Sequence, residues 1–73
     1  MTYKLLFKDE DEVLQPGLWK VAVVDSKNIE DESYEICMNV FYDLMTIDNI
    51  DGTRLKLVDN SKDVDSLNSM INN

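Results

Sequence analysis

The stretch NIEDESYEICMNVFYDLMTI, residues 28–47, decides the predicted fold. Its apolar residues recur at the three- and four-residue spacing of an amphipathic helix. Two adjacent stripes result, with Ile29, Ile36, Val40 and Leu44, together with the polar Ser33, on one and Tyr34, Cys37, Phe41 and Met45 on the other. Asn28 is a favourable N-cap, and acidic residues fill the first turn, where the helix dipole favours negative charge. We therefore expect one long helix with a broad apolar face.

Two segments before this helix have the period-two alternation of strands. They are residues 2–8, TYKLLFK, and residues 18–25, LWKVAVVD, separated by a charged loop that ends in Pro16-Gly17. We expect them to form an antiparallel hairpin with a long loop. The residues assigned to the core face are Tyr3, Leu5 and Phe7 on the first strand and Trp19, Val21 and Val23 on the second.

A third strand and a short helix are expected after the long helix. Residues 53–58, TRLKLV, follow an Asp-Gly turn signal and place Leu55 and Leu57 inward. In an alternative arrangement, residues 45–50 pair back across Asp51-Gly52 as a hairpin. Residues 61–71 close the chain as a helix with Asn60 or Ser61 as its cap and with Val64, Leu67 and Ile71 on one face.

The predicted element order is β-β-α-β-α, in a single domain that spans residues 1–73. The expected fold class is α+β: a small, mostly antiparallel three-stranded sheet with the long helix and the short C-terminal helix on one face. The other sheet face is then open, locally basic and partly apolar. By alternation it carries Lys4, Lys8, Lys20, Arg54 and Lys56 beside Leu6, Leu18, Val24 and Val58.

Composition narrows the class of protein. The formal net charge is −8, from 15 acidic and 7 basic residues, which opposes non-specific binding to nucleic acid or to an anionic membrane. A hydrophobic content of 44% favours a folded domain over an acidic disordered tail. The single cysteine excludes an intrachain disulfide, and the N-terminus has no signal-peptide core. We expect a cytoplasmic protein, in the host cytoplasm if it is phage-encoded.

Catalytic and metal-binding groups are scarce. The chain has no histidine, which removes the commonest general base and the commonest metal ligand. Cys37 lies mid-helix among apolar residues and is interpreted as core. Residues 47–52 match part of a calcium loop, but Ile47 stands in place of the first carboxylate and Val58 in place of the last. We expect no enzyme activity, no cofactor and no metal site.

Nucleic-acid binding by the basic sheet face is also not expected. Some RNA-binding modules stack bases on exposed sheet aromatics. The alternation assigns Tyr3, Phe7 and Trp19 to the opposite, core face. The lysines are therefore interpreted as a solvated face.

Two acidic clusters are the candidate binding sites for a partner. One is the solvent face of the long helix, with Glu32, Glu35, Asn39, Tyr42 and Asp43, and the other is the loop cluster Asp9, Glu10, Asp11 and Glu12. Carboxylates on a rigid helix can imitate backbone phosphates and occupy a basic groove, with Tyr34, Tyr42 and Met38 adding apolar contact. Small size, acidity and missing catalytic groups are similar, as a class, to those of phage-encoded inhibitors of restriction, CRISPR or DNA-repair enzymes.

The sequence thus predicts an inhibitor or regulator that covers the basic, nucleic-acid-binding surface of a partner protein. The alternative is a structural or assembly subunit that pairs through the open sheet face, with another copy as a homodimer or with a larger subunit.

Overall fold

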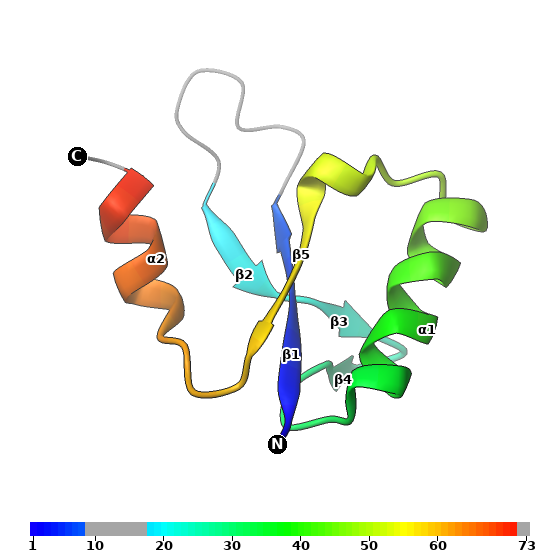
Figure 1. Ribbon diagram of the computed structural model, residues 1–73. Helices are drawn as coiled ribbons and strands as arrows, with labels where there is room; N and C mark the ends of the chain where they lie inside the picture. Colours follow the sequence, from blue (N-terminus) through cyan, green and yellow to red (C-terminus); the bar gives the residue numbers. More distant parts are fainter. Residues whose placement is uncertain (9–17, 72–73) are drawn as a thin grey trace.

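The computed structural model describes residues 1–8 and 18–71 (Figure 1). Within these residues, β2, β1 and β5 form a three-stranded antiparallel sheet in that order, with β1 in the centre. The α+β class and the β-β-α-β-α order are confirmed, with a small additional hairpin formed by β3 and β4. The elements are β1 (Tyr3–Lys8), β2 (Trp19–Val21), β3 (Val23–Val24), β4 (Lys27–Asn28), α1 (Tyr34–Thr46), the 3₁₀ helix η1 (Gly52–Arg54), β5 (Leu55–Asp59) and α2 (Val64–Ile71).

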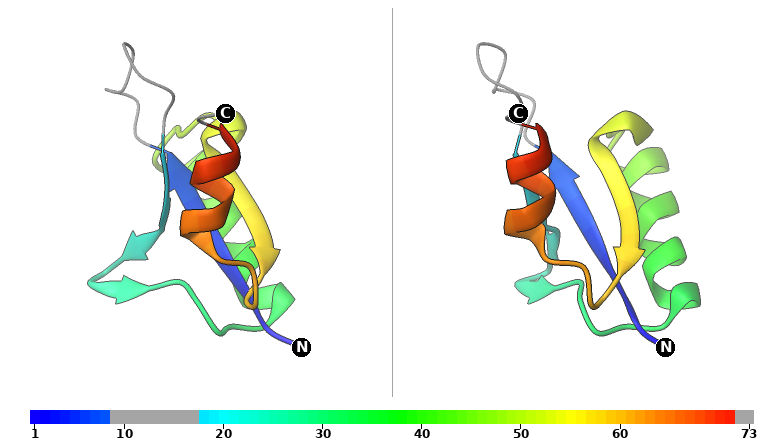
Figure 2. Two further views of the ribbon diagram at one scale, coloured as in Figure 1. Left: turned by 90° about the vertical axis from the view of Figure 1, so that its left-hand side faces the viewer. Right: turned by 60° about the vertical axis from the view of Figure 1, so that its left-hand side comes forward.

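The two helices lie on opposite faces of the sheet. Leu5 and Leu6 are adjacent in β1, and both are 0% exposed. Because successive residues of a strand point to opposite faces, both faces of β1 must be covered. Figure 2 shows α2 in front of the sheet and α1 behind it. The expectation that both helices share one face is therefore wrong, because the chain after β5 crosses the second face to bring α2 beside β2.

The register of β2 is shifted by one residue from the expected one. Lys8 pairs with Trp19 and Leu6 with Val21, so Trp19 and Val21 lie on the α2 face and not on the face of Leu5. The inward residue near this position is Ala22, which is 4% exposed, whereas Val23 is 62% exposed. A register shift of one residue exchanges the two faces of a strand, so all the residues of β2 that were expected to face the core lie on the other face.

A tight hairpin interrupts the segment that the sequence predicts as one strand. Val23 pairs with Asn28 and Val24 with Lys27, across a turn in which Asp25 and Ser26 have φ of 51° and 66°. Two consecutive residues with positive φ are typical of a type I′ turn, whose twist matches that of a hairpin. Asn28 is therefore a strand residue, and its assignment as a helix N-cap is wrong.

Helix α1 begins five residues later than the sequence predicts. Ser33 is its N-cap, and its hydroxyl accepts a hydrogen bond of 3.2 Å from the Ile36 N–H. The preceding backbone pairs with β1 instead: the Leu5 N–H donates to Ile29 O, and Glu32 and Tyr3 exchange two hydrogen bonds. Ile29 and Glu32 satisfy their backbone groups in strand-like pairing, and the Asp31 N–H donates to the Asn60 side chain. This tertiary gain outweighs the local helix signal.

The main core lies between α1 and the sheet. Its buried members come from β1, β5, α1 and the segments that flank the β3–β4 hairpin. The half-buried Phe7, Val24, Val40, Phe41 and Leu57 pack against them. The predicted inward positions Cys37, Leu44 and Leu55 are confirmed, whereas Ile36 is 44% exposed. The apolar face of α1 is thus narrower than expected. The buried members are Leu5, Ala22, Ile29, Cys37, Leu44 and Leu55.

The segment after α1 follows the predicted order but not the alternative hairpin. Asp51 caps η1 by accepting a hydrogen bond from the Thr53 N–H, and β5 pairs with β1 rather than with residues 45–50. Helix α2 starts at Val64, later than expected. The residue whose side chain accepts a hydrogen bond from the first turn, from the Asp65 N–H, is Asp63 and not Asn60 or Ser61. Val64 and Leu67 are half-buried, as expected for its inward face.

Candidate functional site

Charge is strongly segregated along the chain. Between Lys27 and Arg54 the sequence contains seven acidic residues and no basic one. This segment includes α1 and both of its flanks. The side of the molecule built around α1 is therefore the anionic side, and the field there favours a cationic partner.

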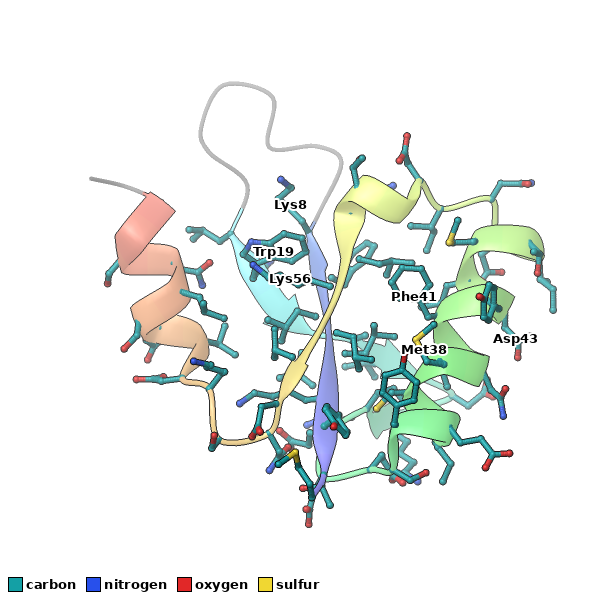
Figure 3. The ribbon with its side chains drawn as sticks, viewed as in Figure 1. Lys8, Trp19, Met38, Phe41, Asp43 and Lys56 are labelled. Carbon is teal, nitrogen blue, oxygen red and sulfur yellow. The ribbon has the colours of Figure 1, made fainter. Side chains whose placement is uncertain are left out.

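The solvent side of α1 carries four of the predicted binding residues. Glu35, Asn39, Tyr42 and Asp43 are all exposed, and we call them the acidic helix face. Figure 3 shows Asp43 pointing away from the sheet, whereas Met38 and Phe41 point toward it. With a rise of about 1.5 Å per residue, Glu35 and Asp43 lie about 12 Å apart along the helix axis.

Glu32 does not belong to the acidic helix face. It precedes α1 and forms an isolated antiparallel β-bridge with Tyr3. Its carboxylate forms an ion pair with Lys27 Nζ at 2.8 Å, and its side chain is 18% exposed. Its carboxylate is therefore paired with Lys27 and holds the chain ahead of α1. The prediction that Glu32 faces solvent on the helix is wrong, because the helix starts after it.

Met38 is a second correction near this face. It is half-buried and points toward the sheet, so it does not add apolar contact at the outer rim. Tyr34 is 55% exposed, although the sequence places it on an apolar stripe of the helix, and its ring lies edge-to-face on that of Tyr3 with 5.6 Å between centroids. The other acidic cluster, Asp9, Glu10, Asp11 and Glu12, lies outside the described residues, as does the predicted turn at Pro16-Gly17.

Cys37 is buried in the core beneath α1, as its sequence position predicts. Burial raises the pKa of its thiol, and the nearby negative charge of Glu32 raises it further. A thiolate is the nucleophilic form of cysteine, and both effects disfavour it. The geometry supports packing and not catalysis as the role of Cys37.

Two aspartates, the exposed Asp51 and the half-buried Asp59, serve local structure. Asp51 accepts hydrogen bonds from the Thr53 N–H and hydroxyl, and Asp59 accepts from the Ser61 N–H and hydroxyl. These hydrogen bonds lower the pKa of both carboxyl groups. Asp51, which closes the loop that partly matches a calcium motif, is thus engaged as a cap. In the described part of the chain, no three Asp, Glu, Cys or His side chains are grouped to hold a metal ion.

The second sheet face differs from the open basic face that the sequence predicts. Trp19 lies on it, with Lys8 Nζ 5.1 Å and Lys56 Nζ 5.8 Å from its ring centroid (Figure 3). The assignment of Trp19 to the core face is therefore wrong. The ring is half-buried, and these cation–π contacts hold the two lysine side chains against the sheet.

Helix α2 also covers the edge of β2. The Asn68 side chain accepts from the Trp19 N–H at 2.7 Å and donates to Trp19 O at 3.0 Å, which satisfies edge groups that would otherwise be open to another strand. Leu6 is fully buried, and Val24 packs on the α1 core. The expected apolar pairing surface of Leu6, Leu18, Val24 and Val58 is therefore not a single open face.

Sequence reasoning missed a different apolar surface, located beside α1. Val23 and Ile47 are 62% and 73% exposed, and both line hollows between α1 and β3. Their exposure depends on the β2 register and on the β3–β4 turn. The positive-φ pair Asp25 and Ser26 carries little sequence signal, because neither residue is glycine.

Comparison of the chain with protein-family models, with curated proteins and with solved structures found no match. Among the described residues, no helix is long and apolar enough to cross a membrane.

Proposed function

We propose that this protein is a non-enzymatic inhibitor or regulator that uses the acidic helix face to cover the basic surface of a nucleic-acid-binding protein. It acts in the cytoplasm, and in the host cytoplasm if a phage encodes it. The carboxylates take the place of nucleic-acid phosphates on the partner. The protein itself binds neither nucleic acid nor a membrane.

The observation that carries this proposal is the unopposed charge around α1. Glu35 and Asp43 are exposed on one rigid helix, within the long segment that has no basic residue. Their axial separation of about 12 Å corresponds to three to four steps between successive phosphates along one strand of duplex DNA, at about 3.4 Å per step. Because the helix already holds these charges, binding costs little additional ordering entropy.

Charge reversal on α1 tests the proposal against a matched control. Glu35 lies in the first turn of α1, and Asp65 lies in the first turn of α2 on the opposite side of the molecule. Glu35→Lys and Asp65→Lys change the net charge equally and carry the same helix-dipole cost. We expect Glu35→Lys to weaken partner binding at least tenfold, about 1.4 kcal/mol, and Asp65→Lys to change it much less.

The partner is captured from nuclease-treated host extract on the immobilised protein and identified by mass spectrometry. The expected partner is a nucleic-acid-binding protein that added duplex DNA or RNA displaces. Raising salt from about 0.05 to 0.5 M should slow association, because the screening length falls from roughly 14 to 4 Å. A partner that binds Glu35→Lys as tightly as the parent protein, or whose binding does not respond to salt, would contradict the proposal.

A further inference from the structure

Two adjoining hollows lie between α1 and the strands that precede it. One has a volume of about 240 Å³ and the other about 220 Å³, and Leu44 and Asp48 line both. We call the pair the Leu44 groove. Its apolar walls come from three places in the chain: β3, α1 with its C-cap, and the loop before η1. The residues that matter here are Val23, Val24, Val40, Leu44, Ile47 and Ile50.

Apolar side chains also extend out of the groove to its rim. Ile47 is 73% exposed at the C-cap of α1, and Val23 is 62% exposed on β3. Ile36, which is 44% exposed, lies on the same side of α1, four residues before Val40 and eleven before Ile47. Apolar hollows continuous with exposed aliphatic side chains are typical of protein interaction surfaces.

The rim of the groove is acidic. Asp25, Asp43 and Asp48 line it, and all three are exposed. The ion pair found among the described residues is that between Lys27 and Glu32. It involves none of these three carboxylates, so none of them is paired with a described basic side chain. An occupant must therefore supply apolar groups for the walls and positive charges for the rim.

The size of the hollows indicates what enters them. Each is smaller than the roughly 300–1,000 Å³ of a small-molecule pocket, so each suits one apolar side chain. Neighbouring anchors of a helix, at i and i+3 or i+4, are about 5–6 Å apart and suit two hollows that share a wall. Amphipathic helices bind other grooves in this way.

We propose that the Leu44 groove binds a basic amphipathic helix of the partner protein. Two apolar side chains of that helix enter the hollows, and its Lys or Arg residues meet Asp25, Asp43 and Asp48. This proposal rests on the proposed function and names the segment of the partner that is recognised. Asp43 belongs to both surfaces, so one basic partner can contact the acidic helix face and the groove together.

Two synthetic peptides of about 20 residues, long enough to form helices, separate the groove from charge alone. One has Leu on one face and Lys on the other, and its control replaces every Leu with Ala at the same charge. We expect the Leu/Lys peptide to bind at least tenfold more tightly and to shift the methyl resonances of Val23, Leu44 and Ile47. Ile47→Ser should weaken its binding at least about fivefold, whereas Ile47→Val, which keeps the apolar rim, should stay within about twofold.

Three results have distinct meanings. Equal binding of the two peptides, with Ile47→Ser without effect, overturns the groove proposal and leaves the proposed function standing. If the Leu/Lys peptide binds at the groove and Ile47→Ser weakens this binding, the groove proposal is supported. This holds even if Glu35→Lys does not affect capture of the host partner, in which case the proposed function fails. A homodimer in sedimentation equilibrium that Ile47→Ser dissociates overturns the proposal, because a second copy then occupies the groove.

Discussion

Leu6→Ala tests whether α2 closes the second face of the sheet. Leu6 is 0% exposed, and Leu→Ala changes at such sites cost about 2–5 kcal/mol. For 73 residues, at about 0.05–0.15 kcal/mol each, the whole stability is about 4–11 kcal/mol, so the change removes a large part of it. If the face were open, as alternation alone suggests, the cost would stay near that of a surface change, about 0.5 kcal/mol.

Urea unfolding, followed by far-ultraviolet circular dichroism and by Trp19 fluorescence, measures this cost. Thermal unfolding should show a midpoint lowered by at least about 8 °C, since 1 kcal/mol corresponds to about 4–8 °C in a domain of this size. Leu5→Ala, on the α1 face, is the buried comparator, and Val23→Ala is the exposed control. If Leu6→Ala unfolds like Val23→Ala, closure of the second sheet face by α2 is refuted.

Three further predictions concern single contacts. The Cys37 thiol should react with a thiol reagent on the order of a hundredfold more slowly in the folded protein than in urea, because it is buried with a raised pKa; rapid native labelling would place it at the surface. Asn68→Ala should lower the free energy of unfolding by about 1–3 kcal/mol, since two hydrogen bonds to Trp19 are lost, whereas Ser69→Ala should leave it unchanged. The pKa of the Asp59 carboxyl is lower in the folded state, so the stabilisation it provides is present above the unfolded pKa of about 4 and is lost as pH falls through the folded value. Asp59→Asn should therefore reduce the fall in the free energy of unfolding at acidic pH, and an unchanged fall would contradict this.

The acidic helix face was predictable because it follows from local periodicity. Any packing of α1 that buries Cys37 and Leu44 leaves the opposite side of the helix exposed. That side carries Glu35, Asn39, Tyr42 and Asp43. Glu32 could not be placed in this way, because its position depends on backbone pairing with Tyr3 across the molecule. The Leu44 groove was not predicted, since its walls come from segments that tertiary packing brings together.

By itself the sequence determined the types and order of the main elements, the inward side of α1 and the anionic character of its surroundings. The elements and the inward side of α1 follow from residue spacings of two, three and four, which are local to one helix or strand, and the anionic character follows from composition. Tertiary structure decided the register of β2, the start of α1 and the face that α2 covers. Each of these depends on which distant backbone or apolar group is available as a partner, as Trp19 with Asn68 and Ile29 with Leu5 illustrate. Pairing energies between segments far apart in the chain outweighed the local helix signal of residues 29–32 and the strand alternation at Trp19. Such energies have no periodic trace in a single sequence.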